Sequence, residues 1–470
     1  MNGVFICKSC KKQYGILPLT AKCERCNSIL EFQLDYDRIE SISFDTPFTF
    51  WRYHTLFPQI EEINRLNWNE GGTPFLKAKN LSSELGNSNI FLKDETKNPT
   101  HSYSDRATSL ILSYALEMQY KSVVCASNGN SGASVAAYAA RSPIDCKIIV
   151  PRKVAIGKLA QMHIFSDDII EVGEILDDSI IFSEELCIRE ELFQATPEIN
   201  PLSIEAQATI VYEIIEKVKN ETLPDWIIIP MGSGGLLWSI WKGFKLFNKL
   251  GLCDALPRIV GVQAVGCSPI VEAFEKNASI SPVSNPNTNA LEILVRNPYW
   301  GEEALTAINE SKGIALSVSD KEIISAERVL ARSEGIFAES ASSATIACVK
   351  RLLDEKVIDK TENVVCLITG SGLKEPYIIK ALSERPKVMG QKVSTKLEIL
   401  RILEVNESYG YKIWQDLGSI KSIQSIYQHL NELEDKELVY SKQLGNKKYF
   451  VITEKGKQVL SALETLVDLL

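Results

Sequence analysis

The feature that most constrains the fold is a repeated alternation of short apolar runs and amphipathic stretches between residues 70 and 385. Most runs end in Gly, Ser or Asn before a stretch with helical spacing; they read KSVVCAS, CKIIVPR, DWIIIPMGSGG, PRIVGVQAVG and NVVCLITGSG. Apolar runs of this length are typical of strands that are buried on both faces. The alternation therefore predicts an α/β fold with a parallel sheet and crossover helices, with ligand sites at the carboxyl ends of the strands.

Three of these strand ends carry glycine-rich loops, which are Ser127–Gly132, Gly232–Leu236 and Thr369–Leu373. Glycine lets the backbone approach a ligand closely, and the amides at the start of a following helix favour an anion. Each loop alone is also explained by the glycine that a tight strand-to-helix turn needs. Three such loops on one sheet favour a ligand that carries a phosphate.

Four of the eleven cysteines form a compact N-terminal set: Cys7, Cys10, Cys23 and Cys26. Two CxxC pairs at this spacing place four thiolates tetrahedrally around one Zn²⁺ ion. Four thiolates leave no open position, so the predicted zinc site is structural. The alternatives are a chance pair of CxxC sequences or a disulfide. The other cysteines stand mostly in apolar runs, and we expect them to be buried thiols.

The segment from Lys93 to Arg106 resembles a known family motif. Its stretch NPTHSYSDR is similar to the signature NPTGSFKDR of threonine synthases, which are tryptophan-synthase-β-like, fold-type II, pyridoxal-phosphate (PLP) enzymes. Further similar stretches follow in the family's order over residues 48 to 380: WRYHTLFP, NEGGTPFLKA, SNGNSGASVAAYAA, VAIGKLAQ, GVQAVGCSPIVEAF, EGIFAESASSAT and TGSGLKEP. The resemblance implies the fold-type II PLP-enzyme fold with two parallel-sheet subdomains, and some archaeal-type members also carry a zinc ribbon.

The same resemblance implies roles for the three loops. The cofactor-binding residues would be Asn130 at the ring hydroxyl, Thr369 at the pyridine nitrogen, and Gly232, Ser233, Gly234, Gly235 and Leu236 at the phosphate. The residues implied for the substrate carboxylate are Ser127, Asn128, Gly129 and Ser131. An amino-acid-type small molecule is therefore the expected ligand.

Ser104 stands where the resemblance places the catalytic lysine. In the family that lysine forms an imine with PLP and moves protons at the substrate, and both tasks need an amine whose pKa burial lowers. A serine hydroxyl forms no imine, so we predict that Ser104 is inactive and that PLP, where bound, is held without a covalent bond. Lys93 and Lys374 stand where the family also carries lysine, and no other lysine is an obvious substitute.

Further departures from the family surround Ser104. The motif has His101, Tyr103 and Ala107 for the family's Gly, Phe and Gly, the phosphate loop reads GSGGL rather than GNGGN, and the stretch IEAQAT has Ala206 and Ala208 for Gly and Lys. A laboratory substitution of one lysine would leave those neighbours intact, so we interpret the site as drifted or repurposed. His101 could act as a base beside Ser104, although a lone loop histidine is more often a satisfied polar group.

Residues 389–470 are predicted to form a separate winged helix-turn-helix. TKLEILRILEVN has helical spacing, a second helix opens at Tyr409–Trp414, and a third covers Ser422–Leu433. A β-hairpin follows, with strands around Leu438–Lys442 and Lys448–Ile452, before a final helix. The stretches YGYKI, SIYQHLNELEDKEL and YFVITEKGK resemble PadR-like regulators.

We expect this module to contact DNA through its third helix and its hairpin. The predicted contact residues are Lys421, Ser422, Ser425, Lys442, Lys447 and Lys448. The module carries as many basic as acidic residues, so binding depends on charges that gather on one face. The alternative is a winged helix used for dimerisation.

Composition limits the remaining possibilities. The net charge of −9 argues against indiscriminate nucleic-acid binding by the whole molecule. The opening MNGVFICKSC has charged and cysteine residues too early for a signal peptide, and no apolar stretch is long enough to cross a bilayer, so we expect a cytoplasmic protein without membrane contact. The predicted domains are a zinc ribbon (1–35), a threonine-synthase-like PLP-fold domain (36–388) and the winged helix (389–470).

Two functions from different classes fit this organisation. In the first, a threonine-synthase-like domain without its lysine senses a small molecule, and the winged helix acts as a transcriptional regulator on DNA. In the second, the chain is a threonine synthase-type enzyme that converts O-phosphohomoserine to threonine and phosphate. A catalytically silent partner of an active relative is a third possibility. The family resemblance and the winged helix both suggest a homodimer.

Overall fold

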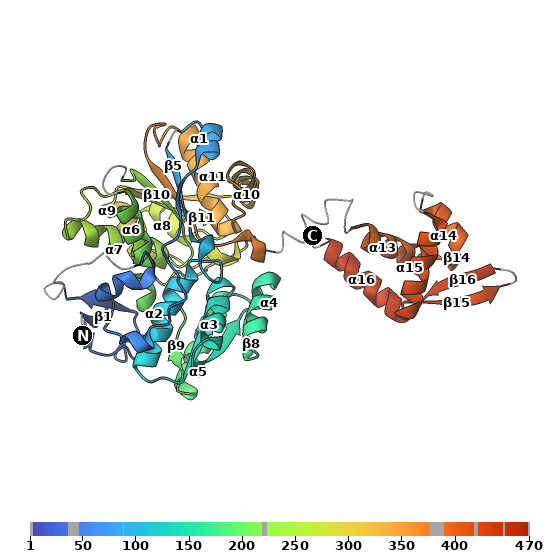
Figure 1. The fold of residues 1–470 in the computed structure, drawn as a ribbon, viewed down its shortest axis with the longest axis horizontal. Helices are drawn as coiled ribbons and strands as arrows, with labels where there is room; N and C mark the ends of the chain where they lie inside the picture. Colours follow the sequence, from blue (N-terminus) through green and yellow to red (C-terminus); the bar gives the residue numbers. More distant parts are fainter. Residues whose placement is uncertain are drawn as a thin grey trace. The chain divides into compact units, whose positions relative to one another are not determined.

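The structure is a computed structural model that describes residues 3–35, 47–87, 89–218, 223–375, 390–417, 422–444 and 447–468. The chain divides into two compact units, Met1–Glu375 and Pro376–Leu470 (Figure 1). The first unit includes the cysteine-rich N-terminus as well as the α/β region. The predicted boundaries at residues 36 and 389 lie outside the described residues.

A six-stranded sheet forms one half of the α/β region, and all its neighbouring pairs are parallel except β4 with β5. In spatial order its strands are β12 (Ile314–Val318), β11 (Arg258–Ala264), β10 (Trp226–Pro230), β13 (Val364–Ile368), β5 (Ile90–Asp94) and β4 (Phe75–Lys77). The helices of this half are α1 (Lys79–Leu85), α6 (Leu202–Val218), α7 (Gly235–Lys249), α8 (Pro269–Lys276), α9 (Gly301–Glu310), α10 (Asp320–Glu334) and α11 (Ser340–Asp354).

The central strands are apolar throughout because helices cover both faces of the sheet (Figure 1). Successive residues of β10 serve opposite faces: Ile227 and Ile229 join the apolar cluster that includes α7 and α9, whereas Trp226 and Ile228 join the cluster that includes α10 and α11. Two apolar cores on one sheet fix the strand ends, and therefore the loops that follow them.

A second, four-stranded parallel sheet forms the other half of the α/β region. Its strands, in spatial order, are β8 (Ile169–Glu171), β7 (Asp145–Val150), β6 (Ser122–Ala126) and β9 (Phe193–Gln194). Its helices are α2 (Ser104–Glu117), α3 (Asn130–Ala140), α4 (Ile156–Phe165) and α5 (Leu176–Arg189). The predicted fold of two parallel-sheet subdomains is confirmed.

The N-terminal ribbon is a three-stranded antiparallel sheet in the order β2 (Gln13–Tyr14), β1 (Gly3–Cys7) and β3 (Leu30–Leu34). It packs onto the α/β region through its own backbone: the Leu17 amide donates to the Tyr114 hydroxyl at 2.9 Å, and Lys242 on α7 donates to the Phe32 carbonyl at 2.9 Å. The ribbon therefore belongs to the first unit rather than standing alone.

The C-terminal unit has the predicted winged-helix elements. Its elements are α13 (Gly390–Val405), β14 (Ser408–Tyr409), α14 (Gly410–Asp416), α15 (Ile423–Asp435), β15 (Val439–Leu444), β16 (Lys447–Ile452) and α16 (Glu454–Asp468). The hairpin strands run to the pair Leu444 and Lys447, so they are longer than the sequence predicted. Its apolar core includes Leu403, Ile426, Leu430 and Phe450. Among the described helices of the whole chain, none is both long and apolar enough to span a membrane.

Candidate functional site

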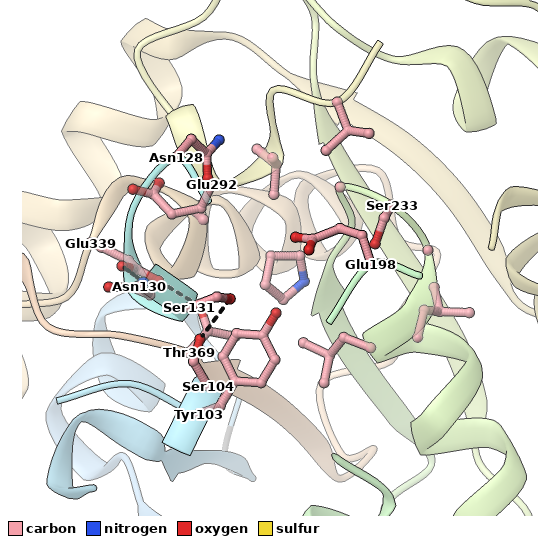
Figure 2. Close-up of a pocket in the computed structure, with 18 residues that line it drawn as sticks. Tyr103, Ser104, Asn128, Asn130, Ser131, Glu198, Ser233, Glu292, Glu339 and Thr369 are labelled. Carbon is pink, nitrogen blue, oxygen red and sulfur yellow. Dashed lines mark hydrogen bonds between the residues drawn. The ribbon is translucent and has the colours of Figure 1, made fainter. Parts of the chain in front are cut away.

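A cavity of about 70 Å³ lies where the loops after β6, β10 and β13 meet the start of α2 (Figure 2). The predicted site residues that line it are Ser104, Asn128, Asn130, Ser131, Gly232, Ser233, Gly234, Leu236 and Thr369. The predicted residues Ser127, Gly129 and Gly235 lie in the same loops without lining the cavity. The carboxyl ends of the parallel strands thus bring together the residues that the sequence singled out.

The loop Gly232–Leu236 opens helix α7 with a geometry that needs glycine. Gly234 has φ +88°, and a Cβ there would lie 2.6 Å from the carbonyl oxygen of Trp300. The first amides of a helix have no partner within the helix, so this end of α7 offers hydrogen-bond donors to a bound group. Backbone geometry alone fits the predicted anion position.

Ser104 begins α2 and is buried beside the cavity. Its hydroxyl oxygen lies 3.5 Å from that of Ser131, and its amide donates to Ser102 at 3.3 Å. His101 does not assist it: the residue is exposed, and its ring Nδ1 lies 3.2 Å from the Thr96 carbonyl oxygen. The interpretation of His101 as a satisfied polar group therefore fits better than that of a base beside Ser104.

Glu339 connects the two residues that were predicted to face the cofactor ring. Its carboxylate accepts from Asn130 Nδ2 at 2.7 Å and from the Thr369 hydroxyl at 3.0 Å. Lys158 Nζ lies behind this group, 3.4 Å from Glu339 and 3.0 Å from Glu375, and it also contacts Glu292. Glu292 and Glu339 line the cavity, so Lys158 compensates two of its carboxylates from outside the lining.

Lys374 is a buried amine that contacts Asn130, one of the residues predicted to face the cofactor ring. Its Nζ donates to Asn130 Oδ1 at 2.7 Å and to the Thr100 carbonyl at 2.9 Å. Burial lowers the pKa of Lys374 to about 8. The side chain is nevertheless directed to Asn130, and Lys374 does not line the cavity as described.

Glu198 is a site residue that sequence reasoning missed. It lies between β9 and α6, and Figure 2 shows its carboxylate directed into the cavity beside the loop that carries Ser233. Its Oε2 is buried and has no hydrogen-bond partner. Burial, reinforced by the negative charge of Asp177, raises the pKa of Glu198 to about 7. No motif marks this residue, because only the packed turn brings it to the loop.

A fully buried group of charged side chains accounts for the role of Lys93. Lys93 Nζ lies 2.6 Å from Glu213, and Arg106 lies 2.5 Å from Glu213 and 2.8 Å from Glu95. The two cations hold the pKa of Glu213 at about 2. Lys93 is thus committed to an internal ion pair, and it is no substitute for a lysine at position 104.

The four N-terminal cysteines come together as predicted. Their Sγ atoms all lie within 4.8 Å of one another, and the Cys7–Cys26 and Cys10–Cys23 pairs are 3.4 and 3.6 Å apart. Tetrahedral zinc with Zn–S bonds of about 2.3 Å places sulfur atoms about 3.8 Å apart. The cluster therefore fits a zinc ion, and its four thiolates leave no position for a substrate.

The described residues among those predicted to contact DNA are Ser422 and Ser425 at the start of α15, and Lys442, Lys447 and Lys448 on the hairpin. Ser422 caps α15 by accepting from the Ser425 amide at 3.3 Å, whereas Lys421 lies outside the described residues. On the hairpin, Lys448 pairs with Glu434 at 3.1 Å, Lys442 contacts Glu407, and Lys447 Nζ lies 4.0 Å from the centre of the Tyr409 ring. The hairpin lysines already have partners within the module, which DNA phosphates would have to replace.

Comparison with known proteins identifies the family. Residues 67–370 match the family described as pyridoxal-phosphate dependent enzyme. The chain belongs to this family. A threonine synthase of Methanocaldococcus jannaschii is 41% identical over 81% of this chain and 95% of its own length, and one of Methanosarcina acetivorans is 36% identical over 84% and 98%.

Solved structures of two further proteins show the same fold. Threonine deaminase isoform 2 of Solanum lycopersicum aligns with a TM-score of 0.55 at 22% identity over 66% of this chain and 82% of its own. Maize serine racemase aligns with a TM-score of 0.56 at 19% identity over 66% and 92%. In the C-terminal unit, residues 399–462 match the transcriptional regulator PadR-like family, which confirms the predicted module.

PLP is the cofactor of the family, and two features of this cavity do not fit it. A serine hydroxyl at position 104 forms no imine with the cofactor aldehyde. Beside the loop implied for the cofactor phosphate, Glu198 places a buried carboxyl oxygen without a partner, and none of the described lining residues is a cation that would balance a phosphate. The residues present do not fit PLP held through a lysine at position 104, although the α7 backbone retains an anion-binding form.

Proposed function

We propose that this chain is a ligand-responsive, DNA-binding transcriptional regulator that uses a PLP-enzyme fold as its sensor. The observation that carries the proposal is the hydroxyl of Ser104, which lines the cavity at the first residue of α2. The chemistry of a PLP enzyme needs an amine at this position. The PadR-like module on the same chain supports a role at DNA. A retained cavity with lost covalent chemistry is what a sensor requires.

The proposed DNA contact uses α15 in the major groove and the hairpin lysines at phosphates. Lys442 and Lys448 exchange their partners Glu407 and Glu434 for phosphate oxygens in this arrangement. A homodimer would present two such modules to a symmetric operator. The cysteine cluster, in this proposal, binds one zinc ion that holds the two CxxC turns of the ribbon together.

The test is selection of genomic DNA fragments by the full-length protein, with and without candidate amino acids. We expect a defined set of retained fragments whose occupancy changes with ligand. Lys442→Ala and Lys448→Ala should each reduce the slope of log affinity against log salt by about one. The matched control is Lys455→Ala, which removes a lysine of α16 that pairs with Glu437 and lies outside the predicted DNA contact. Failure to retain DNA at low salt would overturn the regulator proposal.

A threonine synthase-type enzyme is the second candidate, and two observations favour it. The relatives at 41% and 36% identity are threonine synthases, and the buried amine of Lys374 lies one hydrogen bond from Asn130. The test is release of phosphate and threonine from O-phosphohomoserine with added PLP. A borohydride-stable PLP adduct on Lys374, together with turnover, would establish this candidate and remove the pseudoenzyme argument.

A further inference from the structure

The charged side chains that line the cavity are all acidic. Glu198, Glu292 and Glu339 line it, and none of the described lining residues is Lys, Arg or His. Glu292 and Glu339 share the single cation Lys158 with Glu375, and Glu339 also accepts from Asn130 and Thr369. Glu198 has no such cation, and Asp177 adds a second negative charge near it. The described lining therefore carries an excess of acidic groups, and Glu198 is the one among them without a cationic partner.

Glu198 is fixed beside the phosphate loop by a single residue. Trp300 Nε1 donates to the Glu198 carbonyl at 3.0 Å, and the Trp300 amide donates to the Ser233 carbonyl at 2.8 Å. Trp300 is itself almost fully buried. These bonds hold the backbone of Glu198 next to the loop, and Figure 2 shows its carboxylate directed into the cavity, where it would face a phosphate at the amides of α7.

Like charges repel strongly where little water screens them, so this arrangement disfavours phosphate dianions. An ammonium group gains from the same carboxylate. Size points in the same direction, because about 70 Å³ is far below the roughly 300–1,000 Å³ of sites for drug-sized ligands. The cavity therefore favours a small ligand with a cationic group and no phosphate.

Hydrogen-bond donors stand across the cavity from Glu198. Figure 2 shows Asn128 and Ser131 on the side opposite Glu198, in the loop that opens the eleven-residue helix α3. The first amides of α3 and the Ser131 hydroxyl suit a carboxylate. A ligand with an ammonium at one end and a carboxylate at the other matches both sides at once.

We infer that the cavity binds a free, unphosphorylated α-amino acid, with its ammonium at Glu198 and its carboxylate at the Ser127–Ser131 loop. The inference rests on the proposed sensor function, since it names the ligand class of that cavity. Binding involves ion pairing and hydrogen bonding alone. Glu198 is the residue that separates this ligand class from PLP and from phosphorylated amino acids.

The experiment uses the full-length protein and calorimetric titration. The standard L-amino acids are first screened by thermal shift, and the strongest is titrated against its N-acetyl derivative, which lacks the cationic amine. PLP, O-phosphohomoserine and inorganic phosphate are titrated in parallel. We expect the free amino acid to bind at least about tenfold more tightly than the N-acetyl form. This comparison needs no variant, so a folding defect cannot obscure it.

Glu198→Gln keeps the side-chain shape and removes the charge. We expect it to weaken amino-acid binding by about tenfold or more and to strengthen binding of phosphate or PLP. Glu327→Gln is the matched control, because Glu327 is also a buried carboxyl with a raised pKa but does not line the cavity. Its amino-acid affinity should equal that of the unmodified chain.

Three results would overturn the inference: no amino acid binds, PLP or phosphate binds more tightly than every amino acid, or Glu198→Gln leaves amino-acid binding unchanged. The regulator proposal fails separately. Amino-acid binding through Glu198 without any DNA retention would overturn the regulator proposal but leave the ligand assignment intact. DNA retention with tight PLP binding would overturn the ligand assignment but leave the regulator proposal intact.

Discussion

The indole nitrogen of Trp300 donates to the backbone carbonyl of Glu198 at 3.0 Å, which ties the backbone of this residue to the glycine loop at the start of α7. The Trp300 amide holds the other side of this link at the Ser233 carbonyl. One buried residue therefore links the backbone that carries Glu198 to the anion-binding backbone. Position 300 lies far from Glu198 in sequence and lines no part of the cavity.

Trp300→Phe should weaken both stability and ligand discrimination. The variant leaves the buried Glu198 carbonyl without its donor, which costs about 1–3 kcal/mol, and the smaller ring adds a packing loss. Urea unfolding measures the first effect, and titration with an amino acid and with phosphate measures the second. Trp241→Phe loses a comparable indole contact, to Glu310, at a distance from the cavity. Equal ligand discrimination in both variants would argue against a positioning role for Trp300.

Ser104→Lys restores an amine but leaves the phosphate loop opposed by Glu198. We expect little borohydride-stable PLP adduct in this variant, and substantially more in the double variant Ser104→Lys with Glu198→Gln. Mass spectrometry of the reduced protein measures both. Full modification of the single variant would show that Glu198 does not hinder the cofactor phosphate.

Glu213→Gln should destabilise the first unit by about 3–5 kcal/mol, because it leaves Lys93 and Arg106 buried with too little negative charge. Chemical denaturation followed by tryptophan fluorescence measures the loss. Glu272→Gln provides the comparison, since its partner Lys276 is exposed and such pairs contribute at most about 1 kcal/mol. Similar losses at both positions would contradict the structural role of the buried charges.

Stability should fall as pH rises from 5 to 8. Burial raises the pKa of both Glu198 and Glu327 to about 7, so the folded state binds these protons more tightly than the unfolded chain. Their contribution is complete below the ordinary carboxyl pKa and is lost as pH passes through 7. The pKa of His54 is lowered, so this residue makes stability rise with pH. Variants of the two glutamates are therefore needed to separate their contribution from that of His54. Glu198→Gln and Glu327→Gln should each flatten the dependence of unfolding free energy on pH; unchanged slopes would refute the assignment.

Removal of zinc should loosen the ribbon. We expect one zinc ion per chain by elemental analysis, and none in Cys10→Ser. The melting temperature of that variant should drop by on the order of 5 °C. Cys146→Ser, a partly buried cysteine outside the cluster, should keep both the metal and the melting temperature. Metal-free wild-type protein with an unchanged melting temperature would exclude a structural zinc site.

The loops at the strand ends could be predicted from the sequence, but the charge balance of the cavity could not. Continuous apolar strands such as β10 and β13 require cover on both faces, which forces a parallel sheet and brings Ser104, Asn130 and Thr369 to one place. Glu198 carries no such signal, because a carboxylate in a short turn is ordinary in sequence. Lys158 and Glu339 stood within stretches that resemble threonine synthases, but only the packed structure shows that they neutralise one another.

The hairpin of the C-terminal unit gives a similar contrast. Its strands follow from alternating residues and a polar turn, and the structure confirms them. The pairing of Lys442 with Glu407 does not follow, because Glu407 precedes the hairpin by a whole helix-turn-helix and lies near it only through β14. Long-range partners of surface charges are set by topology rather than by local pattern.

The first turn of α2 has a consequence for how such a chain evolves. Arg106 anchors this turn to the buried charges, whereas Ser104, two residues earlier, contributes only a distant hydroxyl contact to Ser131. Selection for a stable fold therefore acts strongly at one position and weakly at the other. A duplicate gene that lost the amine at position 104 would still encode a folded protein, and it would be free to acquire a new role without passing through an unstable intermediate.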